Sequence, residues 1–262
     1  MQDLKVSIIQ ADLIWEDREA NLKAFAKKID QIEESTDLII LPEMFTTAFT
    51  MNAKELAEPD QGETFDWMIN KARDKNADLI GSIITKDNNA FYNRLYWVKS
   101  DGSFLKYDKR HLFRMAGEHN IYSAGNKKSV GTIKNWSVLP LVCYDLRFPV
   151  WSRNVNQEYD LIIYIANWPA RRSTHWRSLL QARAIENQAY AIGVNRVGTD
   201  GFDITYRGDS AIIDPLGTII KQGANTEFVH TEELSYKKLQ DYRQKFPVWM
   251  DADSFKMREE DG

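Results

Sequence analysis

Hydrophobic residues along the chain form short continuous runs, and amphipathic stretches separate these runs. VSIIQ (6–10) and DLIIYIAN (160–167) are mostly apolar at consecutive positions, which is typical of β-strands buried on both faces. Over residues 22–32, hydrophobic side chains recur every three or four positions, which predicts one buried face of a helix. The same criteria predict further helices over 64–76 and 174–187 and further strands over 37–43, 77–84, 137–143, 189–198 and 228–234, and strand structure over 208–222 that folds back at 214–217.

Turn signals and repeated fragments indicate how these elements are organised. Asp101-Gly102 lies between the alternating segments 91–100 and 103–109, which predicts a β-hairpin. The fragment Asp-Leu-Ile opens three of the strands, each time after a helical stretch. This alternation predicts an α/β fold in which helices cover nearly continuous apolar strands. No Gly/Ser-rich linker divides the sequence, so we expect a single domain over 1–262.

Composition and charge narrow the functional classes. With 43% hydrophobic residues, the chain is expected to bury a substantial core. The net charge is −4 with both signs interspersed, so neither a nucleic-acid footprint nor a polybasic membrane patch is expected. The opening MQDLKVSIIQ does not resemble a signal peptide, and no run approaches transmembrane length. The single cysteine suits a reducing compartment, so we expect a soluble cytoplasmic protein without nucleic-acid or membrane partners.

Three predicted strands end in a chemically capable side chain. Glu43 follows DLIILP, Lys109 follows SFLKYD and Cys143 follows VLPLV. Functional sites in open α/β sheets form beyond the carboxyl ends of strands. A lone cysteine is most often a small buried hydrophobic residue. A carboxylate, an ammonium group and a thiol at three strand ends instead favour a catalytic site.

These residues lie in recognisable motifs, namely LPEMF, YDKRHLF and VCYDLRFP. The set resembles the Glu-Lys-Cys triad of the nitrilase superfamily of carbon–nitrogen hydrolases. The resemblance runs nearly end to end and includes ANWPARR, WRSLLQARAIENQ and DPLGTII. It implies a four-layer α-β-β-α sandwich and a C-terminal extension from about residue 235. It also implies a homodimer or higher homo-oligomer formed through a helical face.

Physical chemistry gives each triad residue a role in hydrolysing a small-molecule amide. Only the thiolate is a good nucleophile, so Cys143 needs a base, which Glu43 can supply. Lys109 can stabilise the oxyanion together with the backbone N–H of Tyr144. A thioester would form and water would hydrolyse it. Glu118 matches a second glutamate described for the family, which positions substrate or water. Because lysine and backbone donors stabilise the oxyanion, we expect no metal and no other cofactor.

Other interpretations of the same residues remain open. A Cys-His hydrolase could use His111, His119 or His175, with Asn167 orienting the imidazole. That interpretation lacks a papain-like local signature around Cys143 and leaves the other strand ends unexplained. A zinc site lacks suitable cysteine and histidine spacing. A non-enzymatic binding module of the same fold would normally have lost one of the three catalytic positions.

The sequence motifs indicate the type of reaction more clearly than they indicate the substrate. The segments VCYDLRFPVWSRN and ANWPARRSTHW are most similar to the bacterial ω-amidase branch of the family, which deaminates 2-oxoglutaramate and 2-oxosuccinamate. A general aliphatic amidase, an N-carbamoyl amidohydrolase and a nitrilase are alternatives within the same fold. One departure from the family pattern is Val150, where many relatives have glutamate.

An ω-amide of a dicarboxylic acid carries a carboxylate far from the reacting carbonyl. A buried carboxylate needs paired donors, and arginine presents the best matched pair. We therefore expect Arg114, Arg171 or Arg172 to bind it. Trp168, which follows the strand 160–167, and Phe45 are further candidates for the substrate pocket, although aromatic residues are more often part of a core.

Four other charged residues near the motifs have structural explanations. Asp145 and Arg147 are expected to support the turn after the cysteine without taking part in the reaction. Arg183 and Glu186 are three apart on a predicted helix, which favours a structural ion pair.

Overall fold

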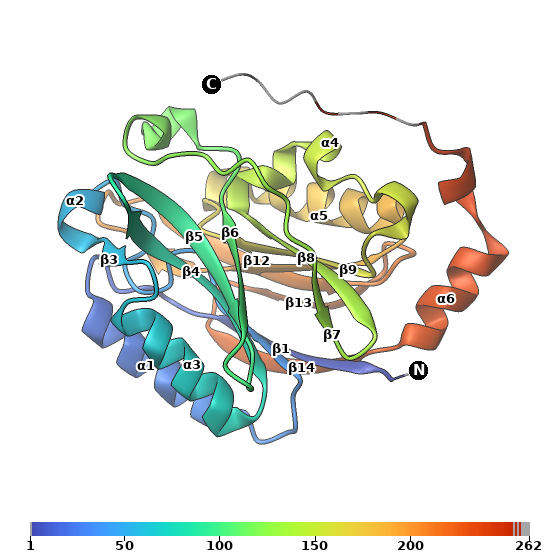
Figure 1. Cartoon of the computed structure of the whole chain (residues 1–262), viewed down its shortest axis with the longest axis horizontal. Helices are drawn as coiled ribbons and strands as arrows, with labels where there is room; N and C mark the ends of the chain where they lie inside the picture. Colours follow the sequence, from blue (N-terminus) through green and yellow to red (C-terminus); the bar gives the residue numbers. More distant parts are fainter. Residues whose placement is uncertain (1, 254, 256, 258–262) are drawn as a thin grey trace.

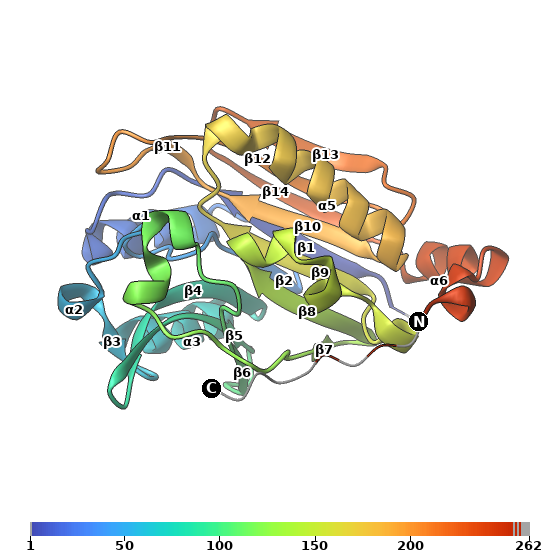
Figure 2. The ribbon, with the colours of Figure 1, turned by 90° about the horizontal axis from the view of Figure 1, so that it is seen from above.

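Two β-sheets face each other and carry helices on their outer faces (Figures 1 and 2). The computed structural model describes residues 2–253, 255 and 257. Each sheet has seven strands and mixes parallel with antiparallel pairs. The predicted four-layer α-β-β-α sandwich is therefore confirmed.

The first sheet has the order β14-β1-β2-β4-β5-β6, with β3 paired to β4. Its parallel centre is β1-β2-β4, and antiparallel strands flank this centre on both sides. The β5–β6 hairpin is the one predicted around Asp101-Gly102. The strands are β1 (Leu4–Gln10), β2 (Leu38–Ile40), β3 (Glu58–Pro59), β4 (Asp78–Asp87), β5 (Ala90–Val98), β6 (Phe104–Asp108) and β14 (Phe228–Leu234).

The second sheet has the order β11-β12-β10-β9-β8-β7, with β13 paired to β12. Its parallel centre is β8-β9-β10. The strands are β7 (Gly131–Ile133), β8 (Trp136–Val142), β9 (Leu161–Ala166), β10 (Tyr190–Asn195), β11 (Val197–Thr199), β12 (Thr205–Ile213) and β13 (Ile219–Ala224).

Helices cover the outer face of each sheet. The helices α1 (Arg18–Asp30) and α3 (Glu63–Lys75) lie against the first sheet, and α5 (Ser173–Asn187) lies against β10 and β12 of the second (Figure 2). Within the described residues, no helix is both long enough and apolar enough to span a bilayer. The remaining helical segments are α2 (Ala53–Leu56), α4 (Pro149–Ser152), α6 (Tyr236–Lys245) and the 3-10 turns Arg114–Ala116, Glu118–Asn120, Cys143–Arg147, Val155–Gln157, Ala170–Arg172 and Val248–Asp251.

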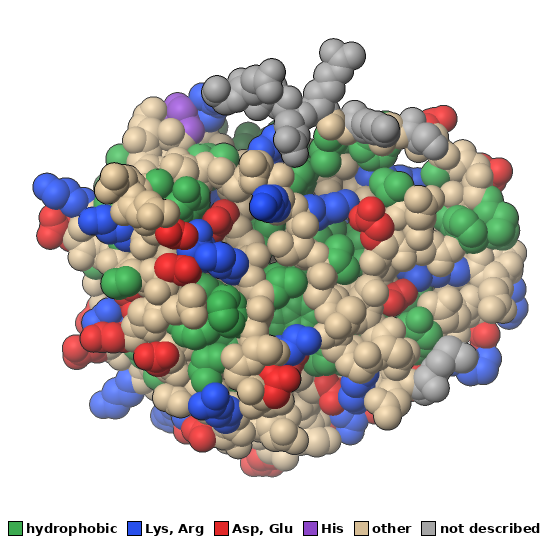
Figure 3. Space-filling view, viewed as in Figure 1, with side chains coloured by type: hydrophobic (Ala, Val, Ile, Leu, Met, Phe, Trp, Pro, Cys, Tyr) green, Lys and Arg blue, Asp and Glu red, His purple; other side chains and the backbone are tan. Residues whose placement is uncertain are grey.

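The core explains why the strands are continuously apolar. Val6 and Ile8 of β1 belong to a hydrophobic cluster that also includes residues of β8, β9 and β10. Ile9 of the same strand belongs to a second cluster, with Phe25 of α1. Both faces of the strand are therefore buried, which removes the polar alternation of a half-exposed sheet. On the surface, charges of both signs are interspersed, as Figure 3 shows for one face.

Two predicted elements differ from the structure at their ends. The predicted strand 37–43 is regular only over Leu38–Ile40, and Met44 then has a φ of 44°, which is incompatible with a continued strand. The predicted strand 189–198 is divided into β10 and β11 at Arg196. The Arg196 side chain is fully buried there and donates to the carbonyl oxygens of Val197 and Leu13.

Candidate active site

Glu43, Lys109 and Cys143 meet between the two sheets. Glu43 lies after β2 and Lys109 directly after β6, whereas Cys143 directly follows β8 of the other sheet. Lys109 Nζ is 2.9 Å from Glu43 Oε1. The exposed fractions are 0%, 1% and 9% for Glu43, Lys109 and Cys143. The structure thus brings the three predicted strand-end residues into one buried cluster.

The turn that carries Cys143 is strained and firmly held. Cys143 is the first residue of the 3-10 turn Cys143–Arg147 and has a φ of 46°, in the left-handed region that non-glycine residues rarely adopt. Asp145 stabilises the turn by accepting hydrogen bonds from the N–H of Val142 (3.0 Å) and of His111 (3.0 Å). Tyr107 also donates to it, at 2.8 Å. The predicted supporting role of Asp145 therefore has a structural basis.

Two asparagines hold Glu43. Asn93 of β5 donates to Glu43 Oε1 at 2.7 Å, and the backbone N–H of Asn167 donates to Oε2 at 2.7 Å. The Asn167 side chain also donates to the Glu43 carbonyl, at 2.6 Å. Neither position is predicted from the sequence as a partner of Glu43. The available signals were an asparagine within the predicted strand 91–100 and another at the end of the predicted strand 160–167.

Glu118 is the second carboxylate bound to Lys109. Its two oxygens accept from Lys109 Nζ at 2.9 and 3.0 Å, and it also accepts from the N–H of Phe113. The ammonium group of Lys109 is thus fixed between Glu43 and Glu118 in a buried environment.

Burial and charge together set the protonation of this cluster. Burial, and then the negative charge of Glu43, raise the pKa of the Cys143 thiol well above its usual value, against an opposing effect of Lys109. Burial also raises the pKa of Glu118. For Lys109, burial would lower the pKa, but the charges of Glu118 and Glu43 outweigh it and raise the pKa above the usual value. The thiol is therefore protonated at neutral pH and needs a base before it can attack.

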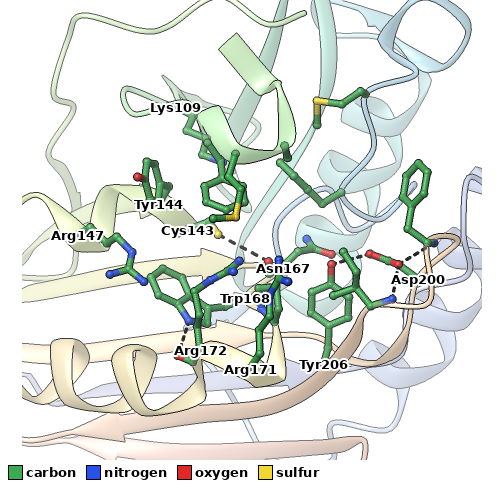
Figure 4. Close-up of a pocket in the computed structure, with 18 residues that line it drawn as sticks. Lys109, Cys143, Tyr144, Arg147, Asn167, Trp168, Arg171, Arg172, Asp200 and Tyr206 are labelled. Atoms are coloured by element: carbon green, nitrogen blue, oxygen red, sulfur yellow. Dashed lines mark hydrogen bonds between the residues drawn. The ribbon is translucent and has the colours of Figure 1, made fainter. Parts of the chain in front are cut away.

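A cavity of about 290 Å³ opens over Cys143 (Figure 4). One part of its wall is apolar and another carries three arginines. The lining residues are Phe49, Met51, Lys109, Phe113, Met115, Ala116, Cys143, Tyr144, Arg147, Asn167, Trp168, Pro169, Arg171, Arg172, Asp200, Phe202, Ile204 and Tyr206.

The substrate-binding candidates divide into two groups. Trp168, Arg171 and Arg172 line the cavity. Phe45 does not, because its ring packs against Phe25 of α1 in the core. Arg114 does not either, because its side chain is exposed on a 3-10 turn whose other residues face the cavity. We therefore remove Phe45 and Arg114 from the candidate site.

Arg147 is placed differently from expectation, since it lines the cavity itself. The predicted ion pair between Arg183 and Glu186 is present, at 2.8 Å. Arg183 also donates to the carbonyl of Leu146 in the cysteine's turn, at 2.6 Å. Helix α5 thereby braces that turn.

The histidines do not form a Cys-His pair. Among the described residues that line the cavity, none is a histidine. His111 contacts Asp145 through Nδ1 at 2.8 Å, and its ring stacks on Phe148. His175 contacts Arg147. In the described part of the chain, no three histidine, cysteine or acidic side chains gather closely enough to hold a metal ion.

Comparison with known sequences gives matches over nearly the whole chain. The family model described as carbon-nitrogen hydrolase matches residues 5–244. Omega-amidase YafV of Escherichia coli (strain K12) is 49% identical over 260 residues, which cover 98% of this chain and 100% of that protein. The 2-oxoglutaramate amidase of Bacillus subtilis (strain 168) is 32% identical, with 94% of this chain and 96% of the relative covered.

A solved structure agrees in fold as well as in sequence. The structure of a CN-hydrolase superfamily protein from Xanthomonas campestris, with an arsenic adduct in its active site, superposes with a TM-score of 0.97. It is 39% identical and covers 98% of this chain and 100% of its own. The two-sheet arrangement described above is therefore shared along the full length of that protein.

Proposed function

Because the chain belongs to the carbon–nitrogen hydrolase family and is an amide-hydrolysing enzyme, we propose that it is an ω-amidase. It releases ammonia from 2-oxoglutaramate or 2-oxosuccinamate, an activity that the names of two relatives support. The observation that carries the proposal is the cavity itself. Lys109 and Cys143 of the buried cluster line it together with three arginines, and Glu43 lies behind them on Lys109.

The first half of the reaction forms a thioester. Glu43 removes the proton from the Cys143 thiol, and the sulfur attacks the amide carbonyl carbon. The oxyanion is stabilised by Lys109 and by the backbone N–H of Tyr144. Tyr144 is the second residue of its 3-10 turn, where an N–H has no partner within the helix. Glu43 then gives its proton to the departing nitrogen, and the C–N bond breaks to release ammonia.

The second half of the reaction hydrolyses the thioester. Glu43, ionised again, takes a proton from water as the water oxygen attacks the thioester carbonyl. The tetrahedral intermediate collapses, the C–S bond breaks, and the sulfur regains the proton from Glu43. Glu118 keeps Lys109 in position through both steps, because it accepts two hydrogen bonds from the same ammonium group.

The surroundings of Glu43 favour a small leaving group. Glu43 is fully buried, and the Phe49 ring lies over Lys109 with 5.1 Å between Nζ and the ring centroid. The leaving nitrogen must therefore reach Glu43 in a confined space, which suits ammonia better than a substituted amine.

Arg172 is the best-placed anchor for the substrate's carboxylate. Its guanidinium lies over the Phe113 ring at 5.1 Å and is partly buried, whereas the neighbouring Arg171 is exposed. No carboxylate of the described residues lies within 4.0 Å of Arg172. A partly buried guanidinium without an anionic partner is suited to bind an anionic ligand.

The experiment that tests the proposed function is a panel of small amides, nitriles and ureides assayed for ammonia release. We expect the highest kcat/KM for 2-oxoglutaramate or 2-oxosuccinamate. A preference for a neutral aliphatic amide, an N-carbamoyl amine or a nitrile would reject the ω-amidase assignment while leaving the cysteine chemistry in place. Failure to hydrolyse any of them would favour a non-enzymatic binding module.

We infer three further properties of the whole protein. Residues 1–262 form one hydrolase domain, supported by a family match that spans residues 5–244, and a C-terminal extension begins at about 235, where α6 (Tyr236–Lys245) follows the last strand. The chain forms a homodimer or higher homo-oligomer through a helical face, supported by the exposed apolar side chains of Val150 on α4 and Ile185 on α5. The protein resides in the cytoplasm, supported by its single free cysteine. Light scattering that gives a monomeric mass would reject the oligomer.

A further inference from the structure

Arg147 is joined to the nucleophile by a short, rigid segment. It is the last residue of the 3-10 turn that begins with Cys143, and it lines the same cavity. Asp145 and Arg183 hold this turn through the hydrogen bonds described above. The distance between the reacting sulfur and the Arg147 side chain is therefore restricted by the backbone, as binding of a small substrate requires.

The guanidinium of Arg147 is held in a defined orientation. Its Cζ atom lies 4.9 Å from the centroid of the Trp168 ring, and Nη2 is 2.8 Å from His175 Nδ1. Arg172 is held in the same way, on the Phe113 ring. Stacking covers the flat face of a guanidinium and leaves its N–H edges available. Figure 4 shows Arg147, Trp168 and Arg172 on one side of Cys143.

The charges of these arginines are not balanced by the cavity wall. Among the described lining residues, Asp200 is the one carboxylate, and it already accepts from the Tyr206 hydroxyl (2.8 Å) and from the backbone N–H groups of Phe202 and Ile204 (2.9 and 3.0 Å). Burial, followed by the charges of Arg171 and to a smaller extent Arg147, lowers the pKa of Arg172. The guanidinium groups thus act on one another, and a ligand rich in oxygen atoms would relieve their repulsion.

We propose that Arg147 is a specificity-determining residue that recognises the 2-oxo group of the substrate. This inference rests on the proposed ω-amidase function. The Arg172 fork binds the two carboxylate oxygens, and Arg147 donates to the adjacent 2-oxo oxygen. The two functional groups are neighbours in a 2-oxo acid, as the two arginines are neighbours in the cavity wall. One arginine satisfies a plain carboxylate, whereas a 2-oxo acid has acceptors for both.

This arrangement also excludes the corresponding 2-amino acids. Glutamine carries an ammonium group where 2-oxoglutaramate carries its oxo oxygen. That group cannot accept from Arg147, and it adds a third positive charge beside two guanidinium groups. Glutaramate has the same carboxylate and amide but lacks the oxo group, so it leaves the Arg147 N–H groups without an acceptor. The two analogues therefore separate charge repulsion from the loss of a hydrogen bond.

The test compares Arg147→Met with the wild type on 2-oxoglutaramate, glutaramate, glutamine and the neutral amide butyramide. We expect kcat/KM for 2-oxoglutaramate to fall about 10- to 100-fold, the scale of a lost charge-assisted hydrogen bond. The value for glutaramate should change less than about threefold, because that substrate makes no such bond. The preference for 2-oxoglutaramate over glutamine should also decrease.

Two further variants and a control make the result specific. Arg147→Lys keeps the charge but loses the planar fork, so it should restore discrimination against glutamine more than activity on 2-oxoglutaramate. His175→Ala keeps the Arg147 side chain but removes the hydrogen bond that orients it, and should cause a smaller loss of about 3- to 10-fold on 2-oxoglutaramate. Arg177→Met, at an exposed position on α5 that does not line the cavity, should behave as the wild type.

Equal losses on 2-oxoglutaramate and glutaramate in Arg147→Met would overturn the inference, because the 2-oxo group would then not be the feature recognised. Loss of butyramide hydrolysis in Arg147→Met would indicate that the substitution damages the turn that carries Cys143. In that case His175→Ala provides the test, and an unchanged preference of this variant for 2-oxoglutaramate over glutaramate would reject the role of Arg147. If the wild type itself prefers glutaramate or butyramide, both this inference and the proposed function fail. If the wild type prefers 2-oxoglutaramate but the Arg147 variants keep the wild-type preference, the role of Arg147 is wrong and the proposed function stands.

Discussion

At the scale of single residues, the cluster of Glu43, Lys109 and Cys143 keeps the resting thiol protonated although the reaction needs a thiolate. Glu43 disfavours the Cys143 thiolate by its charge, yet it is also the base that we propose removes the thiol proton. Burial and the charge of Glu43 therefore keep the free thiol protonated at neutral pH. A permanently activated thiolate forms where an adjacent cation or helix N-terminus dominates; here burial and Glu43 outweigh the effect of Lys109.

Replacing Glu43 with Gln should therefore lower the pKa of Cys143 while it removes activity. The substitution deletes a negative charge beside the sulfur and leaves Lys109, which favours the thiolate. We expect kcat to fall at least about 100-fold, within the range for loss of a general acid and base. The pKa can be measured from thiolate absorbance, with Cys143→Ala in each background as the blank. A thiol pKa that stays constant or rises would contradict the proposed electrostatics.

The carboxylate anchor gives a second prediction at this scale. Arg172→Met should lower kcat/KM for 2-oxoglutaramate by about 1.5–3 kcal/mol, the scale of a charge-assisted hydrogen bond. A neutral short amide should be affected far less. Arg114→Met is the matched control, because that exposed arginine lies outside the cavity. Wild-type efficiency in the variants of Arg172 and of its neighbour Arg171 would reject an arginine anchor.

At the scale of elements, the ends of three strands and one turn position the side chains of Glu43, Lys109 and Cys143. The strands β2 and β6 deliver Glu43 and Lys109 from one sheet, and β8 delivers Cys143 from the other. The turn after β8 keeps Cys143 in a left-handed conformation, which costs about 1–3 kcal/mol. Asp145 is the residue most able to offset this cost, because it receives hydrogen bonds from β8, from Tyr107 and from the His111 backbone.

Asp145→Asn should therefore loosen the turn. The amide keeps the shape of the side chain but cannot accept at both oxygens, so a charge-assisted network loses at least one bond. We expect the free energy of unfolding to fall by about 1.5–3 kcal/mol and kcat to fall more than KM rises. Denaturant titration and steady-state kinetics measure the two effects. Asp214→Asn is the control, because Asp214 makes similar backbone hydrogen bonds in an exposed turn. Equal losses in both variants would argue against a special role of Asp145.

The element scale also shows what could be predicted from the sequence. Strand ends are marked by a change from apolar to polar residues, so Glu43, Lys109 and Cys143 were identifiable. Phe45 follows Glu43 by two positions, and residues two apart share a face only in a regular strand. Met44 has a φ of 44°, and this breaks the alternation, so Glu43 faces the site and Phe45 faces α1.

Arg147 shows that the sequence does not reveal which charged loop residues face a cavity. Whether a charged residue in a loop faces solvent or a cavity depends on contacts with distant segments. Arg147 faces the cavity because Trp168 and His175, from other elements, hold its guanidinium. Such contacts have no local signature in the sequence.

At the scale of the whole molecule, the two-sheet sandwich allows a buried ionic cluster to form at its centre. Glu43 and Lys109 are almost completely buried there, and low polarity strengthens the interaction between their charges. The oxyanion can then be stabilised by Lys109 and a backbone N–H, so no Lewis acid is required. We therefore expect full activity after exhaustive chelation and dialysis. A stoichiometric metal whose removal reversibly abolishes turnover would show that the proposed oxyanion site is incomplete.

The most direct test of the account is to identify the covalent intermediate. Wild-type protein is mixed with 2-oxoglutaramate, quenched in acid during turnover, and analysed by mass spectrometry after proteolysis. Because Cys143 is the only cysteine in the chain, a thioester can form at one site alone. We expect the mass of the 2-oxoglutaryl group on the peptide that contains Cys143, and neither adduct nor turnover in Cys143→Ala. Normal turnover by the folded alanine variant, or an acyl group on another residue, would contradict the account.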